Sequence, residues 1–505
     1  MTTNLADKLR EQVYGTLLRR VGEVADRLGI EAYAVGGIVR DLLLGRKTGD
    51  IDFVTVGPGS GIRLADAVAE ALGGRTAHVY PSFGTAAVHC TLPDGTPTVL
   101  EFVAARRESY RSTSRKPIVE EGTLEDDQLR RDFTINAMAI QVNLERFGIL
   151  IDPFDGRKDL KKRLIRTPLD PALTFEDDPL RMIRAARFAA QLGFEIHPEA
   201  RAAMKLKAER VKILSQERIS DELQKIICAP VPSVGFKLLD ETGLLQYVLP
   251  ELVELKGVEE VDGHRHKDNF FHTLQVLDNV AELTADRPCD ETRWLRWAAL
   301  LHDVAKPATK RFVPETGWTF HGHEDRGARM IPRIFRRLRF PADDRLRYVQ
   351  NLVLLHHRPI ALVDEVVTDS AIRRLLFDAG GDIDDLMVLV RADVTSKNPR
   401  RVRRYLNAFD RVEEKMAEVE EKDRLRNFQP PVDGNEIMEV LGLKPGPEVG
   451  RIKEAIKDAI LDGVIPNEHD AAFDYMMRIK DQILDGIEAG SKKAGRAKNK
   501  KAETE

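Results

Sequence analysis

The sequence has little cysteine and no long apolar run. Its three cysteines among 505 residues are far apart and odd in number, which argues against a disulfide framework or a zinc site built from thiolates. No stretch approaches the roughly 20 apolar residues of a membrane span. The N-terminus alternates charged and apolar side chains, unlike a signal peptide. We therefore expect a cytoplasmic protein with no membrane partner.

An excess of charge of one sign is also lacking. The 78 lysines and arginines nearly cancel the 82 aspartates and glutamates, so the formal net charge is −4. A nucleic-acid partner would have to be bound through local basic patches, because the net field does not attract it. The 42% hydrophobic and 32% charged residues are typical of a soluble globular protein. At roughly 150 residues per domain, the length predicts about three domains.

Hydrophobic periodicity divides the chain into two kinds of structure. The first third mixes helical spacing with short alternating strands, whereas from about residue 170 helix follows helix. This pattern predicts an α+β protein, with a small mixed-sheet head followed by an all-α remainder. Clusters of proline and glycine mark the boundaries. The predicted parts are a head at 1–165, a helical neck at 166–245, a helical body at 246–427, a C-terminal helical segment at 428–489 and a disordered basic tail at 490–505.

Two aspartates one residue apart begin the alternating segment "DIDFVTV". Residues i and i+2 of a strand point to the same face, so Asp50 and Asp52 should project together. Glu101 lies in the apolar strand "TVLEFVAAR", where an unpaired acid is costly. Carboxylate oxygens suit Mg²⁺, which commonly shares its coordination with substrate phosphates, and two such ions support phosphoryl transfer. We predict that these three acids bind catalytic Mg²⁺; for Glu101 alone, a salt-bridged strand residue is the alternative.

A pair of glycines, Gly36 and Gly37, lies between an apolar strand and the helical segment "IVRDLLLG". Without Cβ atoms, they allow backbone N–H groups to approach a triphosphate at the start of this helix, whose dipole favours anions. Arg40 adds a positive charge one turn later. Gly-Gly alone is common in turns, but the ordered string GGxxRDxxLGxxxxDxD is specific and predicts nucleotide binding.

The segment "GGIVRDLLLGRKTGDIDF" resembles the signature of the tRNA nucleotidyltransferase/poly(A) polymerase family, the class II branch of the DNA polymerase β-like nucleotidyltransferases. Three later segments resemble further motifs of that family, in its order: "RRDFTINAMAI", "DPFDGRKDLKKRLIR" and "EDDPLRMIRAARFAAQLGF". The resemblance implies a polymerase-β-like head, with CTP, ATP and tRNA as binding partners. In "RRDFTINA" it implies nucleotide binding by Arg131, with Asp132 and Asn136 holding the ribose and the loop. For the last two residues, a helix cap or turn is the alternative.

The segment "EDDPLRMIRAARF" carries an acid and three arginines at three-residue spacing, namely Asp178, Arg181, Arg184 and Arg187. On a helix they would form neighbouring rows on one face, and an i,i+3 salt bridge on a solvated basic face would explain them. Base selection is the other interpretation. Cytosine and adenine both present an amino donor beside a ring-nitrogen acceptor, which an aspartate and an arginine complement, whereas guanine and uracil present the reverse.

The family resemblance implies base selection. Asp178 and Arg181 match the residues that pair with the incoming base, and Arg184 and Arg187 match nucleotide-contacting arginines of the same helix. Asp177 stands where the family usually has glutamate. The polar stretch at 105–128 is long enough for the flexible loop that full CCA-adding members carry, which disfavours a CC-only enzyme.

Histidine is concentrated in the helical body. The order of His272, the adjacent pair His302 and Asp303, His323, His356 and Asp393 resembles the HD phosphohydrolase superfamily. Imidazoles and carboxylates from separate helices suit Mg²⁺ or a transition metal. We predict that His272, His302, Asp303 and Asp393 bind a divalent metal whose identity stays open. His323 and His356 would line a second metal site or bind phosphate. The alternative is that these histidines are ordinary core or surface residues.

Together these patterns predict a template-independent, Mg²⁺-dependent CCA-adding tRNA nucleotidyltransferase that uses CTP and ATP and releases pyrophosphate, with a phosphohydrolase activity as an addition. The alternatives are a poly(A) polymerase, an A-adding or CC-adding specialist, an HD phosphohydrolase with an RNA-binding head, and a silent RNA-binding protein. The pair Asp50 and Asp52 argues against the last two. Basic clusters at 333–340 and 398–405 would track RNA or form solvated faces, and 430–472 resembles the family's C-terminal RNA-binding segment.

Overall fold

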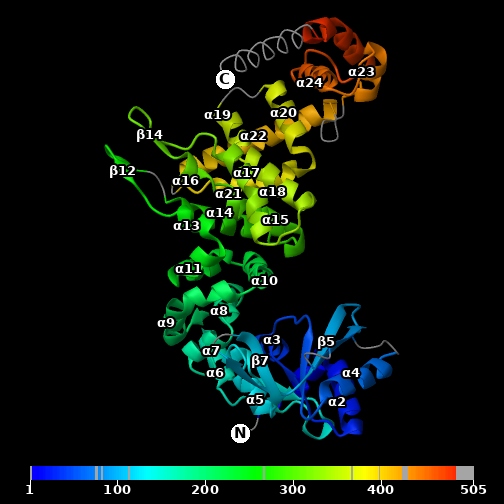
Figure 1. Ribbon diagram of the computed structural model, residues 1–505, viewed down its shortest axis with the longest axis vertical. Coiled ribbons are helices and arrows are strands. Elements are labelled where there is room, and N and C mark those ends of the chain that lie inside the picture. Colours follow the sequence, from blue (N-terminus) through cyan, green and yellow to red (C-terminus); the bar gives the residue numbers. More distant parts are fainter. Residues whose placement is uncertain are drawn as a thin grey trace, which may run out of the picture. The chain divides into compact units, whose positions relative to one another are not determined.

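The computed structural model describes residues 3–73, 78–80, 84–111, 114–265, 268–364, 368–396, 398–423 and 430–484. The chain divides into two compact units (Figure 1). Unit 1 comprises residues 1–254 with 337–340, and unit 2 comprises 255–336 with 341–505. The finer division into head, neck, body and C-terminal segment stays a prediction, and the predicted tail at 490–505 lies outside the described residues.

Unit 1 is built on a seven-stranded mixed sheet, which confirms the predicted α+β head. In spatial order its strands are β3 (His78–Tyr80), β4 (Thr85–Thr91), β5 (Pro97–Ala104), β2 (Ile51–Thr55), β1 (Ala32–Val35), β8 (Ala139–Gln141) and β9 (Leu150–Ile151). Strands β2 and β5 are parallel, and their other neighbours are antiparallel.

Alternation along β2 places Asp52 and Phe53 on opposite faces of the sheet. Phe53 on β2 stacks on Phe102 of β5, with 4.8 Å between ring centroids and both side chains buried. Because successive strand residues point to opposite faces, Asp52 lies on the other face of the sheet from this aromatic pair. Val54, on the same face as Asp52, is also fully buried, so both faces of β2 contribute to the core and Asp52 lies at the start of one of them.

Thirteen helices are described in unit 1. Those of the head are α1 (Ala6–Arg10), α2 (Gly15–Leu28), α3 (Gly37–Leu44), α4 (Ser60–Ala71), α5 (Leu124–Leu129) and α6 (Gly156–Lys162). Those of the helical part are α7 (Pro171–Asp177), α8 (Leu180–Leu192), α9 (Pro198–Lys207), α10 (Gln216–Ile227), α11 (Pro232–Glu241), α12 (Leu245–Val248) and α13 (Pro250–Glu254). Helix α8 packs against α10 and α11, and this packing fixes the face that carries its arginines.

Three expectations for unit 1 need correction. The stretch expected to be a loop contains an antiparallel pair, β6 (Arg106–Arg111) and β7 (Ser114–Glu121). Asp178 does not belong to the arginine-bearing helix, since it lies between α7 and α8 with an extended backbone (φ −137°, ψ 99°). Pro179 follows it, and a proline disfavours helical geometry in the residue before it. A short parallel pair, β10 (Leu164–Ile165) and β11 (Glu195–Ile196), also interrupts the part predicted to be all-α.

Unit 2 is mainly helical. Its helices include α14 (Asn269–Leu283), α15 (Cys289–Leu301), α16 (Lys306–Thr309), α17 (His323–Arg337), α18 (Asp344–Leu355), α19 (Arg358–Asp364), α20 (Asp369–Ala379), α21 (Ile383–Asp393), α22 (Pro399–Asp423), α23 (Gly434–Leu441) and α24 (Pro447–Leu461). A further helical segment follows at 469–484. The all-α prediction missed two small hairpins, β12 (Glu260–Val261) with β13 (His264–Arg265), and β14 (Arg311–Val313) with β15 (Gly317–Thr319).

The central helices of unit 2 form one packed group. Helix α14 contacts both α15 and α21, and α15 contacts α18. Trp297 and Phe270 are fully or almost fully buried between such helices. Within the described ranges, no helix combines the length and apolar character that crossing a bilayer requires.

Candidate active site and metal centre

The three carboxylates predicted to bind Mg²⁺ lie on adjacent parallel strands of unit 1. Asp50 immediately precedes β2, Asp52 is the second residue of β2, and Glu101 of β5 is directly in register with Asp52. Asp50 and Glu101 are exposed and Asp52 is half-buried. The three are absent from the groups of described residues whose ligand atoms all lie within 4.8 Å of one another. The sheet thus brings the three carboxylates near one another, but their oxygen atoms do not form one closely spaced group.

Asp52 is held in an environment that disfavours its charge. Burial raises its pKa to about 6; Arg131 opposes this rise, while Glu101 and Asp50 add to it. Neighbouring carboxylates that repel one another are the donor set expected for a hard cation. The residues present therefore fit Mg²⁺.

Gly36 permits a close approach beside Asp52. Its φ of +77° favours glycine, and a Cβ atom there would lie 3.2 Å from Arg131 Nη1 and 3.4 Å from Asp52 Oδ2. An L side chain would therefore be strained and would crowd both groups. Gly37 begins α3, as predicted, and Arg40 follows within the same helix.

A polar network joins four of the predicted nucleotide-binding residues. Arg184 donates from Nε and Nη2 to Asp132 Oδ2 at 2.8 and 2.6 Å, and Asn136 donates to Asp132 Oδ1 at 3.1 Å. Arg40 donates from Nη1 to Asn136 Oδ1 at 2.8 Å. Burial would raise the pKa of Asp132, but Arg184 and Asn136 lower it to about 2. The network therefore keeps a buried carboxylate ionised and two arginines fixed.

Arg131, another of the predicted nucleotide-binding residues, is held by Asp127, which was not singled out in the sequence. Asp127 is completely buried and accepts from Arg131 Nε at 3.0 Å. Arg130 also pairs with Asp127. An acid four residues before an arginine on a short helix was the available signal, since i,i+4 residues share a helix face.

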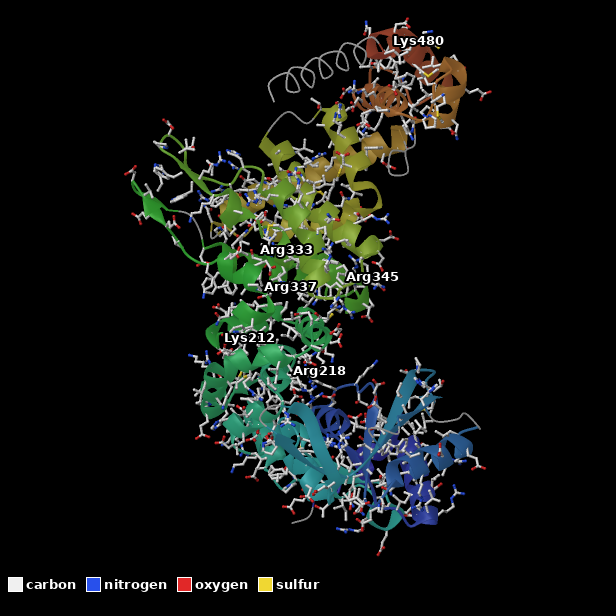
Figure 2. The ribbon with its side chains drawn as sticks, in the orientation of Figure 1. Lys212, Arg218, Arg333, Arg337, Arg345 and Lys480 are labelled. Atoms are coloured by element: carbon white, nitrogen blue, oxygen red, sulfur yellow. The ribbon has the colours of Figure 1, made fainter. Side chains whose placement is uncertain are left out.

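Asp178 and Arg181, the candidate base-reading pair, do not form the i,i+3 salt bridge that a solvated helix face would explain. Asp178 Oδ2 accepts from Arg218 Nη2 of α10 at 2.8 Å, and its Oδ1 accepts from the Leu180 backbone N–H. Arg218 is labelled in Figure 2. Arg181 donates to the backbone carbonyls of Arg130 and Thr174. The two side chains are thus positioned separately, each by its own partner.

Arg187 is more deeply placed than a nucleotide-contacting residue needs to be. It is 8% exposed and forms a 2.9 Å ion pair with buried Glu222 of α10, a partner the sequence did not reveal. Its guanidinium lies over the Phe188 ring, 4.1 Å from the centroid. Burial lowers the pKa of Arg187 to about 10 against the opposing effect of Glu222. The described contacts of Arg187 are thus with Glu222 and Phe188, and nucleotide contact by this residue stays a prediction.

Unit 2 brings the predicted HD residues together. His272 Nε2 lies 2.9 Å from Asp393 Oδ1 and 3.6 Å from Asp303 Oδ2. His302 Nε2 lies 3.2 Å from the same Asp303 oxygen. The other Asp303 oxygen, Oδ1, faces His323 Nε2 at 3.3 Å and His356 Nε2 at 3.8 Å. The four predicted histidines therefore surround the fully buried Asp303, and Asp393 faces two of them, His272 and His302.

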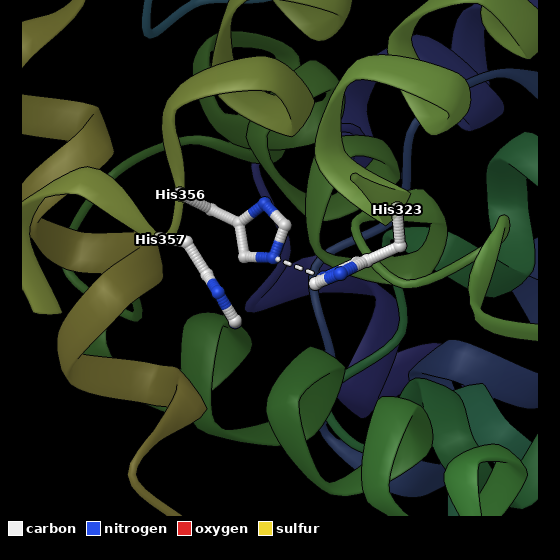
Figure 3. A group of neighbouring side chains, drawn as sticks. All are labelled: His323, His356 and His357. Carbon is white, nitrogen blue, oxygen red and sulfur yellow. Dashed lines mark hydrogen bonds between the residues drawn. The ribbon is translucent and has the colours of Figure 1, made fainter. Parts of the chain in front are cut away.

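Hydrogen bonds orient three of these histidines with Nε2 inward. Nδ1 of His302, His323 and His356 lies within 2.7 to 2.9 Å of the backbone carbonyl three residues earlier. A donating Nδ1–H leaves a lone pair on Nε2. His323 Nε2 and His356 Nε2 are 3.3 Å apart, as the dashed line in Figure 3 marks.

These facing lone pairs fit a cation. His302 Nε2 is buried without a hydrogen-bond partner in the described structure. Burial holds the pKa of His356 well below its usual value, so its imidazole stays neutral and can act as a ligand. The groups with closely spaced ligand atoms are His272, His302 and Asp393; His302, Asp303 and His356; and His323, His356 and His357.

Two neighbours of this centre were not singled out in the sequence. His357, drawn in Figure 3, faces Glu324, with 2.9 Å between Nδ1 and Oε1. Lys306 Nζ lies 2.6 Å from Asp303 Oδ2. The pair His356 and His357 in "VLLHHRP" was a visible signal for the first. For Lys306, the available signal was its position three residues after Asp303, a spacing at which side chains can meet.

Comparisons with known proteins agree with this arrangement. Three family models match the chain: the poly(A) polymerase head domain at 32–166, the probable RNA and SrmB-binding site of polymerase A at 193–255, and the HD domain at 269–396. They cover most of the sheet, the helices of unit 1 from α9 onward and the histidine-rich helices, whereas α7 and α8 lie between the first two matches. The HD model includes every residue of the histidine centre.

Relatives match over most of the chain. An A-adding tRNA nucleotidyltransferase of Deinococcus radiodurans is 33% identical over 87% of this chain and 94% of its own length. A multifunctional CCA protein of Ralstonia nicotianae is 38% identical over 63% of this chain and 70% of its own length. The fold resembles the apo structure of a CCA-adding enzyme, with a TM-score of 0.61 and 22% identity over 97% of both chains. The chain belongs to the tRNA nucleotidyltransferase/poly(A) polymerase family and carries an HD domain.

Proposed function

We propose that this protein is a CCA-adding tRNA nucleotidyltransferase that takes CTP and ATP and extends tRNA 3′ ends. The observation that carries the proposal is the placement of Asp52 and Glu101 in register beside Gly36, next to the network around Asp132. One region of unit 1 thus combines acids that would bind a metal, a glycine turn that would bind phosphates, and arginines held in fixed positions. The CCA-adding and A-adding relatives support the reaction class.

In the proposed reaction the tRNA 3′-hydroxyl attacks the α-phosphate of the nucleotide, and the bond to pyrophosphate breaks. Mg²⁺ held by Asp50, Asp52 and Glu101 would neutralise the charge that develops on the phosphate oxygens. Arg131 and Arg40 would hold the phosphates, and this positioning supplies much of the catalysis in phosphoryl transfer. Asp132 would keep Arg184 in place, because it accepts both of that residue's inward hydrogen bonds.

Choice of C and A would rest on Asp178 and Arg181. Asp178 accepts with both oxygens and Arg181 donates from both Nη groups, so each side chain is fixed, and an incoming base would use their remaining lone pairs and N–H groups. A pair that accepts both cytosine and adenine favours CCA addition over a poly(A) polymerase or an A-adding or CC-adding specialist. The A-adding relative keeps the specialist as the alternative to test.

The experiment is nucleotide addition to defined tRNA ends. Purified protein is incubated with tRNA transcripts ending before CCA, after C, after CC and after CCA, with each NTP separately. We expect CTP incorporation on the first two, ATP incorporation on the third and none on the complete end. ATP incorporation only on the CC end would instead identify an A-adding specialist, and repeated ATP addition to all four would identify a poly(A) polymerase.

We propose a second activity, hydrolysis of phosphoesters at the HD centre. The observation that favours it is the convergence of buried, inward-facing imidazole nitrogens on Asp303. These residues would hold a divalent metal, which supplies Lewis acidity and a water of lowered pKa. His272 would be kept oriented by Thr395 Oγ1, 2.9 Å from its Nδ1.

The two activities should separate. Because the centres lie in different units, the double change His302→Ala with Asp303→Ala should eliminate phosphoester hydrolysis and leave CTP and ATP incorporation unchanged. Hydrolysis of a chromogenic phosphoester and primer extension are measured on the same preparation. Loss of both activities in a protein that still melts cooperatively would contradict separate centres.

A further inference from the structure

Two histidines lie on the same face of the unit 1 sheet as the candidate metal ligands. Glu101 of β5 pairs with Asp52 of β2 on one side and with Ala87 of β4 on the other, and Ala87 pairs with His78 of β3. Side chains of directly paired residues point to the same face, so one row of the sheet runs from Asp52 through Glu101 to His78. His89 follows Ala87 by two residues on β4 and therefore shares this face.

This part of the face is open to solvent. The side chains of His78, His89 and Glu101 are all exposed. The opposite face of the same strands belongs to the core, since Ala86 and Val88 of β4 are fully or almost fully buried and α4 packs against β4 and β5. A substrate can therefore reach the two histidines and the carboxylate along one continuous surface.

The two imidazoles have hydrogen-bonding groups to offer. Their ring centroids are 5.3 Å apart and the rings are nearly perpendicular, at 82°. In the described part of the chain neither His78 nor His89 takes part in a hydrogen bond or an ion pair. Each imidazole carries at least one N–H donor. Neighbouring strands lie about 4.8 Å apart, so His78 is two strands, or roughly 10 Å, from Glu101. That is the length of about three stacked nucleotides.

The acids of the site create a need for such donors. Asp50, Asp52 and Glu101 repel an RNA backbone that passes beside them, and a bound Mg²⁺ would compensate this repulsion only at the reacting end. Phosphates contacted by N–H donors fix the register of a nucleic-acid strand on a protein. The strand that must end at these carboxylates is the one whose 3′-hydroxyl reacts.

We propose that His78 and His89 position the tRNA by donating hydrogen bonds to phosphates of its last three internucleotide linkages. They would thereby hold the 3′-hydroxyl beside Asp52 and Glu101. The inference rests on the proposed transferase function, to which it adds two residues that contact the tRNA end rather than the incoming nucleotide.

The kinetic test uses a tRNA transcript that ends after CC, with ATP. His78→Ala and His89→Ala should each raise KM for tRNA about tenfold, since a hydrogen bond to a charged group is lost, and leave KM for ATP within about twofold. Val79→Ala and Cys90→Ala are matched controls, because they are next to the histidines on β3 and β4 and point to the opposite face. They should leave both KM values unchanged.

Two conservative changes identify the kind of contact. His89→Gln keeps a side-chain N–H donor and loses the ring, so it should recover most of the affinity for tRNA. His89→Phe keeps a ring that can stack on a base and loses the donor. Wild-type KM for tRNA in His89→Phe would show base stacking and overturn the phosphate contact.

A binding readout separates this inference from the transferase proposal. Filter binding without nucleotide compares normal tRNA with tRNAs that carry one uncharged methylphosphonate at each of the last three linkages in turn. We expect at least one of these to bind the wild-type protein about tenfold more weakly, and to bind the His78→Ala, His89→Ala protein less than twofold more weakly. If no tRNA is extended but this difference is found, the transferase proposal fails and the contact stands. Equal losses in both proteins at all three linkages, or no binding of tRNA by the wild type, would overturn the inference.

Discussion

Replacing Asp52 by alanine is expected to abolish nucleotide addition while leaving tRNA binding intact. The carboxylate lies beside Glu101 and Arg131 on the central strands of the sheet, and its loss would remove one of the three proposed ligands of Mg²⁺. Metal stabilisation is worth several kcal/mol, so the rate should fall on the order of a thousandfold or more. Asp50→Ala should have the same direction of effect. Primer extension measures the rate, and filter binding measures tRNA affinity.

The control is Asp52→Asn, which keeps the shape and removes the charge. The pKa of Asp52 is raised to about 6, so the folded protein holds this proton more tightly than the unfolded chain. Stability is therefore lost as the pH rises through about 4 to 6, and the neutral asparagine should recover about 1–3 kcal/mol at pH 7.5. An inactive variant with a higher Tm is the expected outcome. Wild-type addition rates in Asp52→Ala would remove the metal assignment.

Local periodicity predicted the parts of the site that lie in one strand or one turn. The alternation of "DIDFVTV" predicted a strand, and β2 forms there, although it begins only at Ile51, so that Asp50 immediately precedes it. The left-handed backbone at Gly36 likewise follows from a glycine at the strand-to-helix turn. Sequence periodicity and turn residues are therefore sufficient where a feature depends only on neighbouring residues.

Partners from distant segments could not be predicted in the same way. Arg218 and Glu222 come from α10, some forty residues after the groups they hold, and nothing in their own surroundings distinguishes them from solvated charges. The assignment of Asp178 to the arginine helix failed because the three-residue spacing continues through Pro179, although the helix begins only at Leu180. The packing of α8 on α10 decides which charges meet.

The HD centre lies between these two cases. The order of histidines and aspartates indicated the ligands, but their convergence depends on five helices that pack from separate parts of the chain. That His302 and Asp303 adjoin on one segment was readable; that Asp303 would present one oxygen to His302 and the other to His323 was not. His357 was overlooked because an adjacent pair of histidines on a helix normally points in different directions.

Changing the proposed base-reading residues should alter which nucleotides are accepted. Arg181→Ala would remove the donor for the ring nitrogen, and Asp178→Ala the acceptor for the amino group. Each change should cost about 1–3 kcal/mol for the correct base. Incorporation of UTP and GTP relative to CTP and ATP should then rise, even as total activity falls. The measurement is the ratio of kcat/KM values for the four NTPs on one primer.

Two controls distinguish base reading from a loss of local structure. Arg218→Ala frees one oxygen of Asp178 while keeping the acid, so it should perturb selectivity less than Asp178→Ala does. Arg184→Ala breaks the bonds to Asp132 and should weaken all four nucleotides more evenly. If the four ratios are unchanged in both Asp178→Ala and Arg181→Ala, these residues have no part in templating. The anchoring by Arg218 and by the Arg130 carbonyl would then be their whole role, because both contacts persist without a nucleotide.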